Sequence, residues 1–138
     1  MQLSFLDTHL TKESKRKAEK LMSRYKVLEA IIESRKLDLE PRLTANYQAS
    51  ESQRGNQFHS ETEKLALTEM ELEEYVRTRR KLSLIYQSLK PTQQQIWDRR
   101  YTIGQYDTDI YNDLNITDRT YYRLKREMIA VVVEAFGL

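Results

Sequence analysis

The residues of this chain best suited to bind another molecule form a basic segment near the C-terminus. Between Thr117 and Arg126 the chain has four cations and one anion, a local excess of three positive charges. The whole chain of 138 residues has a net charge of only +2. A weak overall charge with one basic face favours a shaped site over general attraction to polyanions. Because arginine pairs with guanine edges and with phosphates, the chemistry expected here is nucleic-acid binding.

A first helix is expected just before this segment. Pro91 begins it, with Thr92 as its cap and Gln95 as the partner of the cap. Ile96, Trp97 and Tyr101 give it an apolar face, and Gly104 breaks it.

Two further helices complete the predicted unit. Asp107 or Thr108 caps a short helix, and Asn115-Ile116 makes a tight turn. Thr117 then caps a last helix that runs to about Phe136. A short helix, a short turn and a longer basic helix are typical of a helix-turn-helix. We therefore expect a DNA-binding domain over residues 91–138.

The last helix has a defined outward face. Tyr121 and Leu124 point inward, which turns Arg119, Tyr122 and Arg123 toward the base edges of a major groove. Tyr122 suits a thymine methyl group or a phosphate, and Asp118 suits cytosine N4 or the orientation of an arginine. Lys125 and Arg126 are expected to hold phosphates, as is the amide end of the short helix near Thr108. The candidate DNA-binding residues are Thr108, Thr117, Asp118, Arg119, Thr120, Tyr122, Arg123, Lys125 and Arg126. The alternative for this unit is a three-helix packing unit with a charged, solvated face.

Residues 1–90 are expected to form an N-terminal helical region, and the C-terminal unit of about 48 residues is expected to lean on its second long helix because it is small for an independent core. Residues 11–39 and 60–90 show apolar residues at steps of three and four, which predicts two long helices. Pro41 ends the first helix, a polar loop spans 41–59, and Ser60-Glu61-Thr62-Glu63 is a capping box for the second. The apolar seam positions are Ala18, Leu21, Tyr25, Leu28, Ile32, Leu39, Leu65, Leu72, Tyr75, Leu82, Tyr86 and Leu89.

Two interpretations of these seams are open. They pack against each other as an antiparallel hairpin, or they form a homodimer seam that pairs two recognition helices on a two-fold operator. The Glu-rich first half of the second helix is either a solvated face or a contact with RNA polymerase.

The composition supports an all-α protein and excludes several classes. There are only 3 Gly and 2 Pro, which disfavours a many-turned β-fold. The chain has no Cys and 2 His, so thiolate metal sites and catalysis by a Ser-His-Asp triad are not expected. It has no apolar run of transmembrane length and no signal peptide, and the absence of Cys fits a reducing cytoplasm. We expect no enzymatic activity, no cofactor, no metal site and no membrane partner.

Several short segments carry a resemblance to known regulators. They are Leu89-Lys90-Pro91, Ile96-Trp97-Asp98-Arg99-Arg100-Tyr101, Asp109-Ile110, Leu114-Asn115-Ile116-Thr117, Thr120-Tyr121-Tyr122-Arg123-Leu124-Lys125-Arg126 and, upstream, Ser60-Glu61-Thr62-Glu63-Lys64-Leu65-Ala66. The C-terminal segments resemble region 4 of sigma-70-type factors and, more closely, the ArpU/RinA-type phage transcriptional regulators. In that family Arg-Tyr precedes the short helix and Thr-Tyr-Tyr-Arg opens the recognition helix. Arg99 departs from the pattern, which usually has an aliphatic residue there.

The resemblance implies a sequence-specific transcriptional regulator in a bacterial host cell. It would activate late phage genes for packaging and lysis, or genes of related mobile elements, and double-stranded DNA would be its partner. Two other functions stay open: a DNA-packaging recognition subunit similar to a small terminase, and a helical adaptor that does not bind DNA.

The all-helical interpretation makes a direct prediction. Far-UV circular dichroism should show that more than about half of the residues are helical, against roughly one third in an ordinary globular domain. A helical fraction below half would contradict the assigned fold class.

Overall fold

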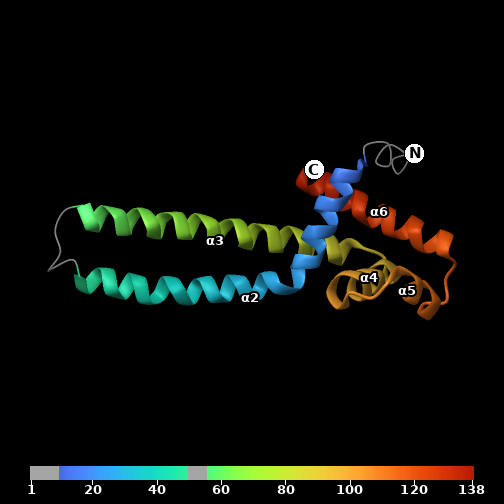
Figure 1. Ribbon diagram of the computed structural model, residues 1–138, viewed down its shortest axis with the longest axis horizontal. Coiled ribbons are helices and arrows are strands. Elements are labelled where there is room, and N and C mark those ends of the chain that lie inside the picture. The colour runs from blue at the N-terminus through green and yellow to red at the C-terminus, as the bar shows by residue number, and fades with distance from the viewer. Residues whose placement is uncertain (1–9, 50–55) are drawn as a thin grey trace. The chain divides into compact units, whose positions relative to one another are not determined.

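The computed structural model describes residues 10–49 and 56–138, with side chains described for 10–39 and 63–138. These residues form five α-helices and one π-helix (Figure 1), so the predicted all-α class is confirmed. None of the helices in this part of the chain is long and apolar enough to cross a membrane. The elements are α2 (Lys12–Ala49), α3 (Asn56–Ser88), α4 (Pro91–Trp97), the π-helix η1 (Asp98–Ile103), α5 (Asp107–Asp113) and α6 (Asp118–Phe136).

The chain divides into two compact units. The hairpin unit is Val27–Arg80, and the head unit joins the chain up to Lys26 with Lys81–Leu138. The division expected between residues 90 and 91 therefore lies inside the head unit. The physical reason is size, because a segment of about 50 residues buries too little surface to form a robust core alone.

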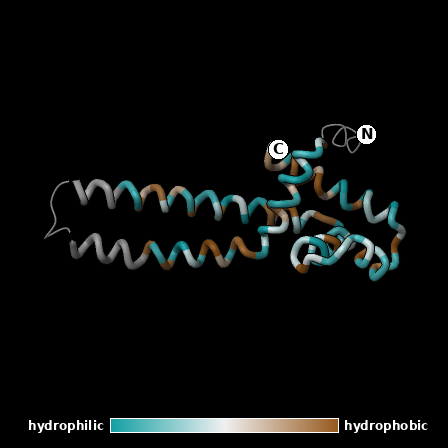
Figure 2. Tube along the Cα trace, viewed as in Figure 1, coloured by the Kyte–Doolittle hydropathy of each residue, from teal (hydrophilic) through white to brown (hydrophobic). Residues whose placement is uncertain are grey.

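The hairpin unit is made of the long helices α2 and α3, which pack together. Leu28, Ile32 and Leu39 are buried along one side of α2, at the heptad spacing that the sequence predicts. Two ion pairs also join the helices, Arg35 to Glu71 at 3.2 Å and Arg79 to Glu29 at 3.3 Å. All four of these charged side chains are well exposed, so the apolar positions supply most of the stability. Hydrophobic positions recur along the described parts of both helices (Figure 2), as an intrachain hairpin requires.

The ends of the long helices differ from the sequence prediction. The backbone of α2 remains helical through Pro41 to Ala49, and α3 already begins at Asn56. The predicted end at Pro41, most of the 41–59 loop and the capping box at Ser60 are therefore wrong. A proline removes one hydrogen bond from a helix, and the neighbouring Glu, Arg, Leu and Ala residues favour helix strongly enough to continue it. Residues 50–55 of the expected loop lie outside the described residues.

The head unit is built around Trp97, which is fully buried. The rings of Tyr25 and Tyr86 meet it edge-on, with centroids 5.9 and 5.6 Å away. The ring of Tyr101 also meets Trp97 edge-on, with a centroid distance of 6.3 Å. Such tilted aromatic contacts add to the stability that burial provides. Tyr25 comes from α2 and Tyr86 from α3, so the ends of both long helices complete this core.

The N-cap of α4 lies two residues before the expected one. Lys90 is the N-cap, Pro91 occupies the first helical position, and the amide of Lys90 donates to Oε1 of Gln93 at 3.1 Å. The expected pair of Thr92 and Gln95 is thus replaced by Lys90 and Gln93. The buried amide of Gln93 also donates to the carbonyl of Leu124 at 3.1 Å, which ties α4 to α6.

The elements of the predicted helix-turn-helix form with small shifts. Gly104, with a φ of 90°, ends η1 as expected. The first residue of α5 is Asp107 and its N-cap is the extended Tyr106, so the expected cap at Asp107 or Thr108 is wrong. Asn115 has a φ of 60° and makes the tight turn. Thr117 then caps α6 as predicted, because its side-chain oxygen accepts from the amide of Thr120 at 3.2 Å.

The turn between α5 and α6 depends on the left-handed backbone of Asn115. Replacing Asn115 with valine should lower the free energy of unfolding by roughly 1 to 2 kcal/mol, because a β-branched residue is strained at positive φ. The Asn115→Gly variant should stay within a few tenths of a kcal/mol of the parent or exceed it. Urea unfolding followed by circular dichroism measures both, and equal stabilities for the two variants would contradict this account.

Candidate nucleic-acid interface

The first turns of α6 present a charged outer face. Asp118, Arg119, Tyr122 and Arg123 are exposed, and Arg126 continues this face one turn later. The opposite face is buried, as expected, through Tyr121, Leu124, Met128 and Val132. Within the described residues, Arg119, Arg123 and Arg126 have no carboxylate in ion-pair range. Their guanidinium groups are available to an outside anion.

The amino end of α6 is fixed by local hydrogen bonds. Besides the cap at Thr117, the hydroxyl of Thr117 lies 2.9 Å from that of Thr120. The carboxylate of Asp118 accepts from the amide of Arg119 at 2.8 Å, and its charge complements the positive end of the helix. Three of the sequence-predicted residues, Thr117, Asp118 and Thr120, therefore order the start of the helix. Thr108 is exposed on α5 and takes no part in this set.

The carboxylate of Asp107 joins three elements beneath this face. It accepts from the hydroxyl of Tyr121 at 2.5 Å and from the ammonium of Lys125 at 3.0 Å, both on α6. Nε of Arg100, on η1, lies 3.2 Å from the same carboxylate oxygen. Since Asp107 is the first residue of α5, this contact fixes α5 and η1 against α6.

Lys125 departs from the role that the sequence suggests. Only 8 % of its side chain is exposed, and its ammonium lies 3.0 Å from Asp107 and 3.7 Å from Glu19 of α2. The prediction that Lys125 contacts phosphate is therefore wrong. Lys125 follows Tyr121 by one helical turn, so it lies on the inward side of α6, where the two carboxylates neutralise its charge.

Glu19 extends the network to α2. Besides Lys125, its carboxylate accepts from the hydroxyl of Tyr101 at 2.8 Å. Tyr101 is itself buried, and burial together with the adjacent Glu19 raises the pKa of Tyr101 well above its usual range. Tyr101 therefore stays a protonated donor at neutral pH.

The network also sets the charge states of Asp107 and Tyr121. Burial by itself raises the pKa of Asp107, but hydrogen bonds from Tyr121 and Lys125, with the charges of Lys125 and Arg100, leave the pKa below its ordinary value of 3.8. Burial and the bond to Asp107 raise the pKa of Tyr121 well above its usual range. At neutral pH an ionised Asp107 thus accepts from a protonated Tyr121.

Two other tyrosines support the exposed Tyr122. Its ring centroid lies 5.2 Å from that of Tyr121 and 6.4 Å from that of Tyr111 on α5. Tyr111 and Tyr121 are themselves 5.6 Å apart. Because Tyr122 remains 43 % exposed, the cluster holds the ring in place while leaving one side free for a ligand.

The sequence did not predict three residues that hold α6 in place. These are Asp107, which contacts Tyr121, Lys125 and Arg100, together with Arg100 itself and Glu19. A usable signal was present, because Lys125 falls four residues after the inward Tyr121 and a buried lysine needs a carboxylate. The acidic stretch from Asp107 to Asp113 offered that carboxylate nearby. Glu19 lies too far away in sequence for any local pattern to indicate it.

Comparison of the chain with protein-family models, curated proteins and solved structures found no match.

The Asp107 network makes a stability prediction. Asp107→Asn should lower the free energy of unfolding at neutral pH by roughly 2 to 3 kcal/mol, because charged hydrogen bonds to Tyr121 and Lys125 are lost. The matched control is Asp113→Asn, whose pair with Arg99 is largely exposed and which should change stability by less than about 0.5 kcal/mol.

The pH dependence has a definite sign. The folded pKa of Asp107 lies below 3.8, so its contribution is complete above that value and is lost as the pH falls through the folded pKa. The stability gap between the parent and Asp107→Asn should therefore shrink below pH 3.8. A gap of the same size in acid and at neutral pH, measured by urea unfolding, would show that the ionised carboxylate is not its source.

Proposed function

We propose that this protein is a sequence-specific DNA-binding transcriptional regulator that inserts α6 into the major groove. One observation carries the proposal: Arg119, Tyr122 and Arg123 are exposed on the first two turns of a helix whose inner side is fixed by Asp107. A helix-turn-helix reads base edges with the first turns of its second helix. A rigid support is what such readout needs, since base contacts tolerate little displacement.

Each exposed side chain has a chemical role in this proposal. Arg119 and Arg123 donate to O6 and N7 of guanine, and Tyr122 contacts a thymine methyl group or a phosphate. Asp118 accepts from cytosine N4 or orients a neighbouring arginine. Arg126 lies farther along the helix, where it drifts from the groove floor toward the phosphates.

The biological context rests on the sequence resemblance. The segments Asp109-Ile110 and Thr120–Arg126 support an activator similar to the ArpU/RinA-type phage regulators. Such a protein acts on late genes for packaging and lysis, or on mobile-element genes, in a bacterial cytoplasm. RNA polymerase is the further partner that activation calls for, and a homodimer would place two α6 helices on a two-fold operator.

Two arginine variants test the proposal. Arg123→Ala should cost about 1 to 3 kcal/mol on a duplex selected from a random pool and less on mixed-sequence DNA, because a base contact carries discrimination. Arg126→Ala should weaken both duplexes similarly and reduce the slope of log affinity against log salt by about one unit. Fluorescence anisotropy over a salt series measures both effects.

The matched control is Arg77→Ala on the hairpin unit. Arg77 is exposed and pairs only weakly with Glu74 at 3.8 Å, so its removal should change neither stability nor DNA binding. The recognition-helix assignment fails if Arg123→Ala keeps normal helicity and full preference for the selected duplex.

A further inference from the structure

The amino end of α2 is a second basic surface of the head unit. From Lys12 to Arg24 it contains six cations and two anions, and Lys12, Lys15 and Arg16 are exposed. Thr11 fixes this end, because its hydroxyl oxygen accepts from the amide of Ser14 at 3.0 Å. The positive end of the helix dipole adds to the same potential. An ordered, strongly positive surface results.

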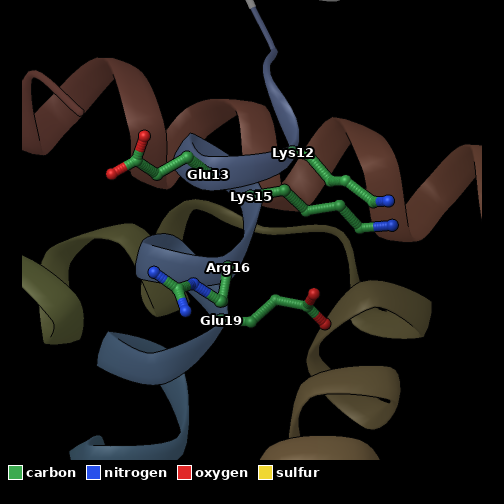
Figure 3. Close-up of a pocket in the computed structure, with 5 residues that line it drawn as sticks. All are labelled: Lys12, Glu13, Lys15, Arg16 and Glu19. Atoms are coloured by element: carbon green, nitrogen blue, oxygen red, sulfur yellow. The ribbon is translucent and has the colours of Figure 1, made fainter.

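The two acidic residues of this segment are occupied elsewhere. Glu13 pairs with Lys17 at 3.4 Å, and Glu19 binds Tyr101 and Lys125. In Figure 3, Lys12 and Lys15 extend in the same direction from α2, whereas Glu13 points the other way. Within the described part of the chain, no carboxylate forms an ion pair with Lys12 or Lys15.

This surface is continuous with the outer side of α6. An open hollow along α2 is lined by Lys12, Lys15 and Arg16 together with the two acids. A second hollow joins it to α6, and Lys15 there shares the lining with Tyr122 and Arg126. Lys15 therefore lies beside two residues of the proposed DNA-binding face, although more than 100 residues separate them in sequence.

We propose that Lys12 and Lys15 form, with Arg126, a phosphate-binding flank of the same DNA interface. The inference rests on the proposed function and extends it to a second element. When α6 lies in the major groove, one sugar-phosphate backbone passes along the edge of α6 and over the amino end of α2. The flank supplies the phosphate contacts that the buried Lys125 does not make.

Double-stranded DNA fits this surface better than a small anion does. The hollow along α2 is open, and the cations that line it are exposed on flexible side chains, so it does not enclose a small ligand. A row of separated cations instead matches the repeated charges of a nucleic-acid backbone. Continuity with the arginine face of α6 selects duplex DNA, because that face has the geometry of a groove reader.

The test compares two double-alanine variants of the full chain. Lys12→Ala with Lys15→Ala should reduce the slope of log affinity against log salt by about two units on a mixed-sequence DNA duplex, since two phosphate contacts are lost. Lys20→Ala with Arg24→Ala removes the same charge from the same helix, at exposed positions eight and nine residues farther along that line neither hollow. This control should leave the slope unchanged. Lys12→Arg with Lys15→Arg should also preserve it.

The outcomes separate the two proposals. Equal slopes for the two alanine pairs would overturn the flank, while the loss of discrimination in Arg123→Ala would still support the recognition helix. If the parent protein binds no duplex DNA, both proposals fail together. Binding to duplex RNA as tight as to duplex DNA would overturn the choice of DNA as the occupant. Circular dichroism and thermal unfolding should show that all three double variants fold as the parent does.

Discussion

The position of the exposed face of α6 depends on the contacts that the Asp107 carboxylate makes with neighbouring side chains. This carboxylate binds Tyr121 and Lys125 from α6 and lies against Arg100 from η1. Lys125 is nearly fully buried, and a buried ammonium without carboxylates would lose its charge or unfold its surroundings. Asp107 and Glu19 supply those carboxylates from two other elements. The orientation of α6 is thereby coupled to the positions of α5, η1 and the first turns of α2.

This coupling explains why residues 91–138 share one compact unit with parts of the two long helices. Its core residue Trp97 packs on Tyr25 and Tyr86, which belong to the two long helices. Ala18, Met22 and Leu82 are buried in the same unit. A small three-helix segment gains from these partners the apolar burial that it lacks by itself. One consequence is that the amino end of α2, with its lysines, is held beside α6.

The sequence predicted most of the fold because local signals were consistent with the packing. Thr117 as a cap, Gly104 as a helix end and the turn at Asn115 follow from side-chain and backbone preferences that act within a few residues. The prediction that α2 ends at Pro41 was wrong, because the helix propensity of the flanking residues outweighs the one hydrogen bond that proline removes. Seam positions were also shifted in part: Met22 and Ile85 are buried although the heptad pattern did not include them.

The candidate site was only partly accessible from sequence for a different reason. The outward direction of Arg119, Tyr122 and Arg123 follows from helix periodicity, which is local. The partners of Lys125 come from α5 and α2, and a contact over such distances in sequence leaves no periodic trace. The same limit applies to Lys15, whose closeness to Tyr122 and Arg126 is a product of tertiary packing.

Lys125 and Arg126 are adjacent in sequence, but Lys125 forms buried ion pairs whereas Arg126 is exposed to solvent. A residue turns by about 100° relative to its neighbour, so Lys125 follows Tyr121 inward while Arg126 stays outside. A compact ammonium on a flexible stem fits between two carboxylates, whereas a planar guanidinium suits exposed pairing with phosphate or guanine. The four cations predicted for DNA on α6 are thus reduced to three, Arg119, Arg123 and Arg126. In the proposed DNA complex, cations of another element can make the phosphate contacts that were expected of Lys125. The exposed lysines at the amino end of α2 are the cations that the fold brings to that side of α6.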